Sequence, residues 1–264
     1  MEIYRLTDLS QEVSSMVFIP VLFLVLYLVF STCDSIWAER RALLKDGKVS
    51  KEGLNQRLAD LYTQRFRLLK FCLMPLLLAF YLASCLLGWP FSGMLQPQTI
   101  SWLIVLALVC GWAGDVLLEV SPKLFPAGLG SFLAGHVFYI IAFARPFFQA
   151  QSSRRFLPLI LCFVISVFYL VFMIRQLFMI EETRQLRIPL GLYLGALVLL
   201  FLSASLRFSY ASPLSACLGL LGAILFTTSD TILSFRMFKG SGETGIMETY
   251  TAAQLLLILS ALLI

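Results

Sequence analysis

Two aspartates stand inside long apolar stretches of the sequence. Asp115 occurs in Gly111-Trp-Ala-Gly-Asp-Val-Leu-Leu-Glu119, and Asp230 ends the segment Gly222-Ala-Ile-Leu-Phe-Thr-Thr-Ser-Asp. Apolar surroundings favour a protonated carboxyl group, and a second carboxylate nearby favours it further in one member of the pair. A pair with one protonated and one ionised member would supply a general acid and a general base. Such a pair suits hydrolysis through a cationic intermediate, and it equally suits a proton-coupled transporter.

A single histidine, His136, limits the metal chemistry open to this chain. That count excludes three-histidine zinc hydrolases and bis-histidine haem proteins. The cysteines form no CxxC pair, and their places in or beside apolar runs indicate small buried residues rather than disulfides or metal ligands. We therefore expect neither a metal nor a cofactor. The six cysteines are Cys33, Cys72, Cys85, Cys110, Cys162 and Cys217.

The composition shows which elements must position these side chains. Of the 264 residues 59% are hydrophobic and only 13% are charged, which excludes a water-soluble, disordered or disulfide-rich protein. At roughly 20 residues per membrane crossing, the chain is long enough for about eight spans in one transmembrane domain, residues 1–264. Continuous apolar runs predict helices and not a β-barrel. The predicted spans are 14–33, 69–87, 99–118, 128–144, 156–174, 188–205, 213–235 and 247–264.

Lysines and arginines predict the orientation of this all-α bundle. Most of the 20 fall in the loops after the odd-numbered spans, which places those loops in the cytoplasm and both termini on the other side. The basic loop 38–68 contains two segments around Asp46-Gly47 that are predicted to be surface helices. The loop is either an orientation signal or a contact with the membrane surface and lipid headgroups. Asp34 and Glu119, at span ends, are expected to be solvated. The charge bias fits a bacterial inner membrane and an endoplasmic reticulum membrane equally.

In this topology the polar candidates lie at one depth. Asp115 and Asp230 come late in spans that run toward the cytoplasm, and the others come early in spans that run away from it. We therefore expect one polar chamber in the cytoplasmic third of the bundle. Each candidate also has a structural reading, as an interhelix hydrogen bond, a snorkelling lysine or an interfacial tyrosine. Two pairs share a helix face, at spacings of three and four residues. The other candidates are His136, Lys70, Tyr139, Tyr193, Tyr250 and Gln254.

A short internal similarity relates the two aspartate segments. Gly114-Asp115-Val-Leu-Leu and Ser229-Asp230-Thr-Ile-Leu occupy the third and seventh predicted spans, four helices apart and in the same direction. The similarity is compatible with two parallel four-helix halves that each contribute one acid. It is equally compatible with chance between two apolar helices.

An ordered set of short motifs resembles the YhhN-like lysoplasmalogenases, a family of multi-spanning membrane hydrolases. The set begins with Lys70 and Pro75, continues with Gly114-Asp115 and Phe132-Leu-Ala-Gly-His-Val-Phe-Tyr-Ile, and covers about residues 68–264. It ends with Tyr193, the segment before Asp230, and Thr249-Tyr250-Thr-Ala-Ala-Gln. Thr251 stands where the family often has a second tyrosine, and residues 38–67 are longer than the family pattern. The first span and this loop lie outside the resemblance.

The resemblance implies hydrolysis of the vinyl ether bond of lysoplasmalogen. The products would be a fatty aldehyde and glycerophosphoethanolamine or glycerophosphocholine. Asp115 and Asp230 would be the general acid and base, in an order left open, with His136 beside them. The side chains of Lys70, Tyr139, Tyr193, Tyr250 and Gln254 would bind or orient a lysophospholipid that enters from the membrane. No nucleic acid partner is expected.

Two other functions remain open on the residues alone. A proton-coupled transporter or lipid carrier would use the same buried aspartates, and a membrane scaffold would need them only for stability.

Overall fold

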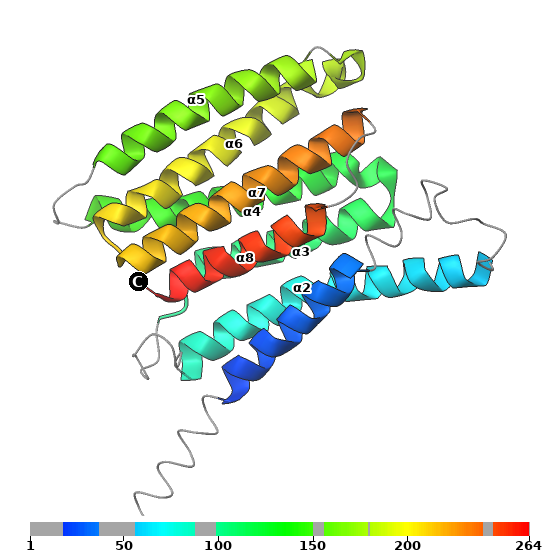
Figure 1. Cartoon of the computed structure of the whole chain (residues 1–264), viewed down its shortest axis with the longest axis horizontal. Helices are drawn as coiled ribbons and strands as arrows, with labels where there is room; N and C mark the ends of the chain where they lie inside the picture. Colours follow the sequence, from blue (N-terminus) through cyan, green and yellow to red (C-terminus); the bar gives the residue numbers. More distant parts are fainter. Residues whose placement is uncertain are drawn as a thin grey trace, which may run out of the picture.

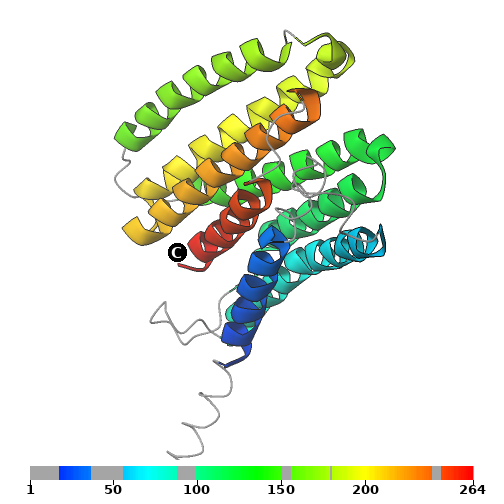
Figure 2. The same ribbon diagram turned by 45° about the vertical axis from the view of Figure 1, so that its right-hand side comes forward.

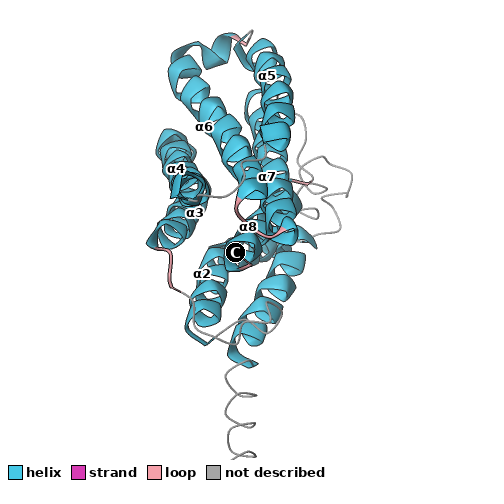
Figure 3. Cartoon of the chain, turned by 90° about the vertical axis from the view of Figure 1, so that its left-hand side faces the viewer, coloured by secondary structure: helices cyan, strands magenta, loops and turns pink. Residues whose placement is uncertain are grey.

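The computed structural model describes residues 18–36, 56–87, 99–149, 156–178, 180–239 and 245–263. These residues form eight α helices, short 3-10 turns and no strand (Figure 3). The all-helical prediction is therefore confirmed for the described part of the chain. The helices are the first helix (Phe18–Ile36), α2 (Gln56–Leu87), α3 (Trp102–Val120), α4 (Phe125–Gln149), α5 (Phe156–Phe178), α6 (Arg187–Leu206), α7 (Pro213–Lys239) and α8 (Ile246–Leu262).

Seven of these helices are long and apolar enough to cross a membrane. The exception is α8, which has 17 residues and is therefore about 25 Å long, against about 30 Å for the hydrocarbon core of a bilayer. The predicted span over 247–264 falls on α8. Eight crossings in two parallel halves remain a prediction.

The predicted surface helix at residues 58–67 is wrong. These residues belong to α2, which runs without a break from Gln56 to Leu87, and its membrane-spanning part begins at Leu68. No glycine or proline lies between Gln56 and Lys70, so nothing in the sequence ends the helix there. The other predicted surface helix, together with most of the loop 38–68, lies outside the described residues.

Two antiparallel helix pairs, α3 with α4 and α7 with α8, form the centre of the bundle (Figure 1). The α6 helix contacts α4, α5 and α7, and α2 contacts α3 and α8. In Figure 2 the first helix lies beside α2, on the side of the molecule away from α5. Gly222 on α7 lets α8 approach closely, because a Cβ atom there would lie 3.1 Å from the carbonyl oxygen of Ala253.

A buried arginine joins four helices at the end of α6. Arg207 is fully buried, and its Nη2 donates to Ser215 Oγ at 2.6 Å and to the carbonyl of Ser260, in the last turn of α8, at 2.7 Å. Its Nη1 donates to the hydroxyl of Tyr210 at 3.2 Å, and the guanidinium carbon lies 4.5 Å from the ring centre of Phe143 on α4. The carbonyl end of α8 favours a cation, so this side chain ties the ends of the helices together.

The outer surface of the bundle is apolar, as expected for a protein in lipid. Along α5, Phe168 is 73% exposed and Leu157 is 68% exposed. The expectation of buried cysteines is confirmed for Cys85 and Cys162, whereas Cys72 and Cys217 are exposed on helix surfaces.

Candidate active site

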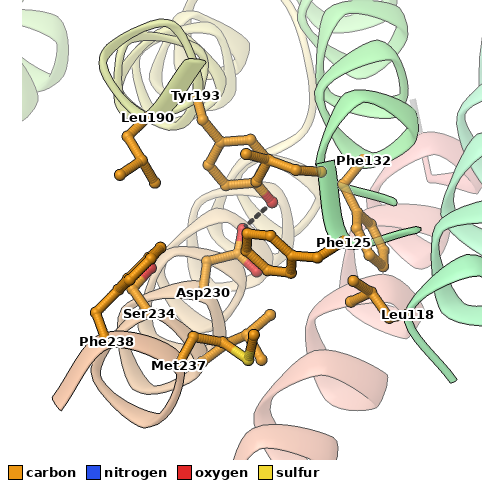
Figure 4. Close-up of a pocket in the computed structure, with 11 residues that line it drawn as sticks. Leu118, Phe125, Phe132, Leu190, Tyr193, Asp230, Ser234, Met237 and Phe238 are labelled. Atoms are coloured by element: carbon orange, nitrogen blue, oxygen red, sulfur yellow. Dashed lines mark hydrogen bonds between the residues drawn. The ribbon is translucent and has the colours of Figure 1, made fainter. Parts of the chain in front are cut away.

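The carboxylate of Asp230 is held from two neighbouring helices. The hydroxyl of Tyr193 on α6 donates to Oδ2 of Asp230 at 2.7 Å (Figure 4), and Nε2 of His136 on α4 lies 3.4 Å from the same oxygen. Both contacts fall on Oδ2, so Oδ1 has no hydrogen-bond partner within the described part of the chain. The side chain of Asp230 is 9% exposed. One carboxylate oxygen is therefore fixed, and the other is open to a ligand.

The second carboxylate, that of Asp115, has a contact on each oxygen. The hydroxyl of Tyr250 on α8 donates to Oδ2 at 3.0 Å, and the ammonium of Lys70 on α2 lies 3.9 Å from Oδ1. The side chains of Asp115 and Lys70 are only 5% and 12% exposed, so little water screens the attraction between them. Asp115 is thus paired with a cation on one oxygen and with a hydroxyl donor on the other.

One aromatic ring connects the two carboxylate groups. The ring of Phe226 on α7 packs edge-on against His136, with centroids 4.6 Å apart, and against Tyr250, with centroids 5.6 Å apart. His136 contacts Asp230 and Tyr250 contacts Asp115, so Phe226 touches a partner of each acid. The contacts thus form two acid centres with an apolar ring between their partners, and a single chamber in the cytoplasmic third remains a prediction.

Two candidate residues bind each other rather than either acid. The hydroxyl of Tyr139 on α4 donates to Oε1 of Gln254 on α8 at 2.7 Å, and both side chains are buried. Gly111 on α3 faces Gln254 and Tyr250, since a Cβ atom there would lie 3.4 Å from Gln254 Nε2 and from the Tyr250 hydroxyl. This hydrogen bond joins α4 to α8 next to the Asp115 centre.

A small apolar pocket reaches Asp230 from the side (Figure 4). It has a volume of about 20 Å³, which is enough for a water molecule. Asp230 and Tyr193 are the members of the predicted set that line it. Met237, 47% exposed, lies at its outer edge. The remaining lining residues are Leu118, Phe125, Leu129, Phe132, Leu190, Leu233, Ser234 and Phe238.

The structure adds residues that the sequence did not single out. Tyr27 and Ser31 of the first helix bind Thr251, the neighbour of Tyr250, through hydrogen bonds of 2.8 and 2.7 Å. The expectation that Asp34 is solvated is wrong, because its exposed fraction is 0%. A polar side chain every three or four residues along an apolar helix was the available signal for this face.

Within the described residues, no three or more histidine, cysteine, aspartate or glutamate side chains are grouped so that they could hold a metal ion.

Comparisons with known proteins give the family. The model of the YhhN family matches residues 66–261. The chain belongs to the YhhN family. It is 35% identical over 166 residues to "Lysoplasmalogenase TMEM86B" of Mus musculus, covering 61% of this chain and 64% of that protein. It is 33% identical over 182 residues to "Lysoplasmalogenase TMEM86B" of Homo sapiens, covering 67% of this chain and 71% of the human protein. No solved structure shows a significant match.

The matched region contains every predicted site residue, from Lys70 to Gln254, and begins inside α2. The seven apolar helices and the family together make this chain a multi-pass integral membrane protein. The first helix precedes the matched region.

Proposed function

We propose that this protein is a lysoplasmalogenase, which hydrolyses the vinyl ether bond of a lysophospholipid within the membrane. The products would be a fatty aldehyde and glycerophosphoethanolamine or glycerophosphocholine. The names of the two relatives, both lysoplasmalogenases, support this activity. The observation that carries the mechanism is the unequal use of the two carboxylates, since Asp230 keeps Oδ1 free beside a pocket and Asp115 has both oxygens occupied.

In the proposed first step, protonated Asp230 acts as the general acid. Its Oδ1 gives a proton to the vinyl carbon that is remote from the ether oxygen. The π electrons form the new C–H bond, and the positive charge is shared between the other vinyl carbon and the ether oxygen. Tyr193 directs the proton to Oδ1, because its own hydroxyl group donates to Oδ2 and occupies that oxygen.

In the second step, the Asp230 carboxylate acts as the general base. A water molecule adds to the cationic carbon and gives its proton to Oδ1, which restores the acid. The resulting hemiacetal breaks its bond to the glycerol oxygen, and that oxygen takes the hydroxyl proton as the aldehyde forms. One water is consumed for each vinyl ether cleaved, so a single aspartate completes the cycle.

We assign Asp115 to charge stabilisation rather than to proton transfer. Its ionised form lowers the energy of a nearby cation in apolar surroundings, where charge interactions are stronger than in water. Lys70 and Tyr250 hold it in that form. His136 and Tyr193 are positioning residues for Asp230, and Phe226 packs against the His136 ring and holds its orientation.

The pocket is too small for an acyl chain, and this suggests how the substrate enters. Met237 and Phe238, at its outer edge, have apolar side chains that can rotate and that a lipid tail can displace. The fatty chain would then remain among apolar residues while the ether oxygen approaches Asp230. An amphiphile that diffuses in the bilayer meets this requirement without crossing water.

The decisive experiment supplies the purified protein with a lysoplasmalogen in D2O. Mass spectrometry should find the free aldehyde with one deuterium on the carbon next to the carbonyl, because the proposed acid protonates carbon. Asp230→Asn should abolish the product, and the lipid-facing variant Thr228→Val should keep it. Uptake of the lipid into sealed vesicles without cleavage, or aldehyde that contains no deuterium, would contradict the proposal.

A further inference from the structure

Pro75 leaves a backbone carbonyl of α2 without its usual donor. In an α helix the carbonyl of Phe71 accepts a hydrogen bond from the N–H four residues later, and Pro75 has no N–H to give. Phe71 lies in the membrane-spanning part of α2, which begins at Leu68. A carbonyl without a donor is costly in such surroundings, so another group has to bind it.

The indole of Trp112 on α3 binds this carbonyl. Its Nε1 donates to the carbonyl oxygen of Phe71 at 3.0 Å. A tryptophan at a membrane surface ordinarily gives its N–H to water or to a lipid headgroup. Trp112 is 41% exposed, yet its N–H donates to the backbone of α2. The bond therefore connects α3 to the position in α2 where a proline has freed a carbonyl.

This hydrogen bond lies beside the Lys70–Asp115 pair. Phe71 directly follows Lys70 on α2. On α3, Asp115 comes three residues, or about one turn, after Trp112. The Lys70 ammonium lies 3.9 Å from Oδ1 of Asp115, which is close to the limit of direct contact. Lysine carries its charge on a flexible stem that can turn toward the membrane surface, so this pair depends on where the backbone places Lys70.

The same proline makes α2 prone to bend at this level. Lys70 lies little more than one turn from Pro75, on its N-terminal side, so a bend there would move Lys70 relative to α3. The hydroxyl of Tyr81 also joins the two helices, because it accepts a hydrogen bond from the N–H of Ser101 at 2.9 Å. That contact lies on the other side of the proline. The bond from Trp112 is therefore the one that fixes the backbone next to Lys70.

We propose that Trp112 is a positioning residue, which holds Lys70 within reach of Asp115. It does so by binding the carbonyl of Phe71. The proposal rests on the role proposed above for Asp115, the stabilisation of a cation formed from the substrate. Without the indole N–H, α2 would move at Pro75 and the ammonium would leave the carboxylate. The reaction would slow at the charged transition state, so kcat would fall with little change in KM.

The test removes the indole N–H with Trp112→Phe, which keeps an aromatic ring at the position. We expect kcat for aldehyde release to fall about 3- to 10-fold, the range for loss of one neutral hydrogen bond, with little change in KM. Reductive methylation followed by mass spectrometry should label Lys70 several-fold faster than in the wild type, because its amine is no longer held against a carboxylate. Trp102→Phe is the matched control, since this tryptophan of α3 is 69% exposed and its indole has no hydrogen-bond partner among the described residues. Labelling of the exposed Lys123 should be the same in all variants.

Pro75→Ala separates positioning from stability. Alanine restores a helical N–H to the carbonyl of Phe71, which keeps a second lone pair for the indole. Trp112→Phe should therefore lower Tm in the wild-type background and leave it unchanged in the Pro75→Ala background. In both backgrounds it should lower kcat and speed the labelling of Lys70. If the loss of kcat disappears together with the loss of Tm, Trp112 acts only through stability and the proposal is overturned.

Labelling of Lys70 does not depend on cleavage, so it separates this proposal from the proposed function. Unchanged labelling in folded Trp112→Phe overturns the proposal even in an active enzyme, and an unchanged kcat does so as well. Where Trp112→Phe alone does not fold, the same comparison is made in the Pro75→Ala background. Faster labelling in a protein that releases no aldehyde would retain the positioning contact and reject the proposed function.

Discussion

His136 on α4 lies 3.4 Å from Asp230 on α7, and this contact has a counterpart in the hydrogen bond between Tyr250 on α8 and Asp115 on α3. Each acid is therefore contacted by the helix that follows the other acid in the chain. These two contacts connect the α3–α4 pair to the α7–α8 pair at both acids.

Asp230→Asn should lower the rate of aldehyde release by at least about 100-fold, the range for loss of a positioned acid or base. Asparagine keeps the size of the side chain and can still accept the Tyr193 hydrogen bond, so the protein should remain folded. Aldehyde release by mass spectrometry and thermal unfolding of the same preparation measure the two effects. Asp115→Asn should slow the reaction less severely, because we assign no proton transfer to it. A rate for Asp230→Asn close to the wild type would refute this assignment.

Tyr193→Phe should lower kcat by about 10-fold, because the variant loses a hydrogen bond to Oδ2 worth about 1.5 kcal/mol. Tyr169→Phe is the matched control. It removes a 3.0 Å hydrogen bond between Tyr169 and Thr231, the residue next to Asp230, without touching the carboxylate. Steady-state kinetics on both variants should find the loss in Tyr193→Phe alone. Equal losses would mean that helix packing rather than the Asp230 contact sets the rate.

Gly114→Ala should destabilise the protein and reduce its activity. A Cβ atom at Gly114 would lie 2.7 Å from the ring of Phe132, which lines the pocket and packs edge-on against Tyr250. Displacing that ring should cost about 1–3 kcal/mol of unfolding free energy. Gly195→Ala is the opposite case, because nothing lies within 4 Å of its Cβ position and alanine favours the helix. Thermal unfolding should give a lower Tm for Gly114→Ala and an equal or higher Tm for Gly195→Ala.

Arg207→Lys should destabilise the bundle by about 2–4 kcal/mol, because one ammonium cannot replace the separate Nη1 and Nη2 contacts. The kcat of the remaining folded protein should stay near the wild-type value, since none of these contacts reaches either acid. Arg145→Lys, an exposed position on α4, should unfold at the wild-type temperature. A loss of kcat at full stability would show that Arg207 acts on the site.

Part of this arrangement could be predicted from the sequence, because the apolar helices and the positions of polar residues along them depend on the local sequence. The places of Asp230 and His136 along their spans put them at one level, which agrees with the 3.4 Å contact between them. The hydrogen-bond partners could not be predicted. His136 and Tyr139 share a helix face as expected, yet one contacts α7 and the other binds α8. Periodicity gives the face of a helix and does not give the neighbour that covers it.

Asp34 shows a second limit of sequence reasoning. A carboxylate near the end of an apolar run normally reaches water, and its burial depends on how the first helix packs against α8. That contact joins residues more than 200 positions apart in the chain. Residues 58–67 show a third limit. Their charged and apolar residues are typical of a separate surface helix. In the structure they continue into α2, because no helix-breaking residue separates them from it.

The continuous α2 helix has a mechanical consequence. With 32 residues it is about 48 Å long, roughly 18 Å more than the hydrocarbon core of a bilayer. Lys70 lies on the same uninterrupted segment as the projecting end, because the internal proline, Pro75, comes one turn later. Because this segment is one continuous helix, a tilt of its basic outer end would also move Lys70. Such a tilt would change the 3.9 Å distance between the Lys70 ammonium and Asp115.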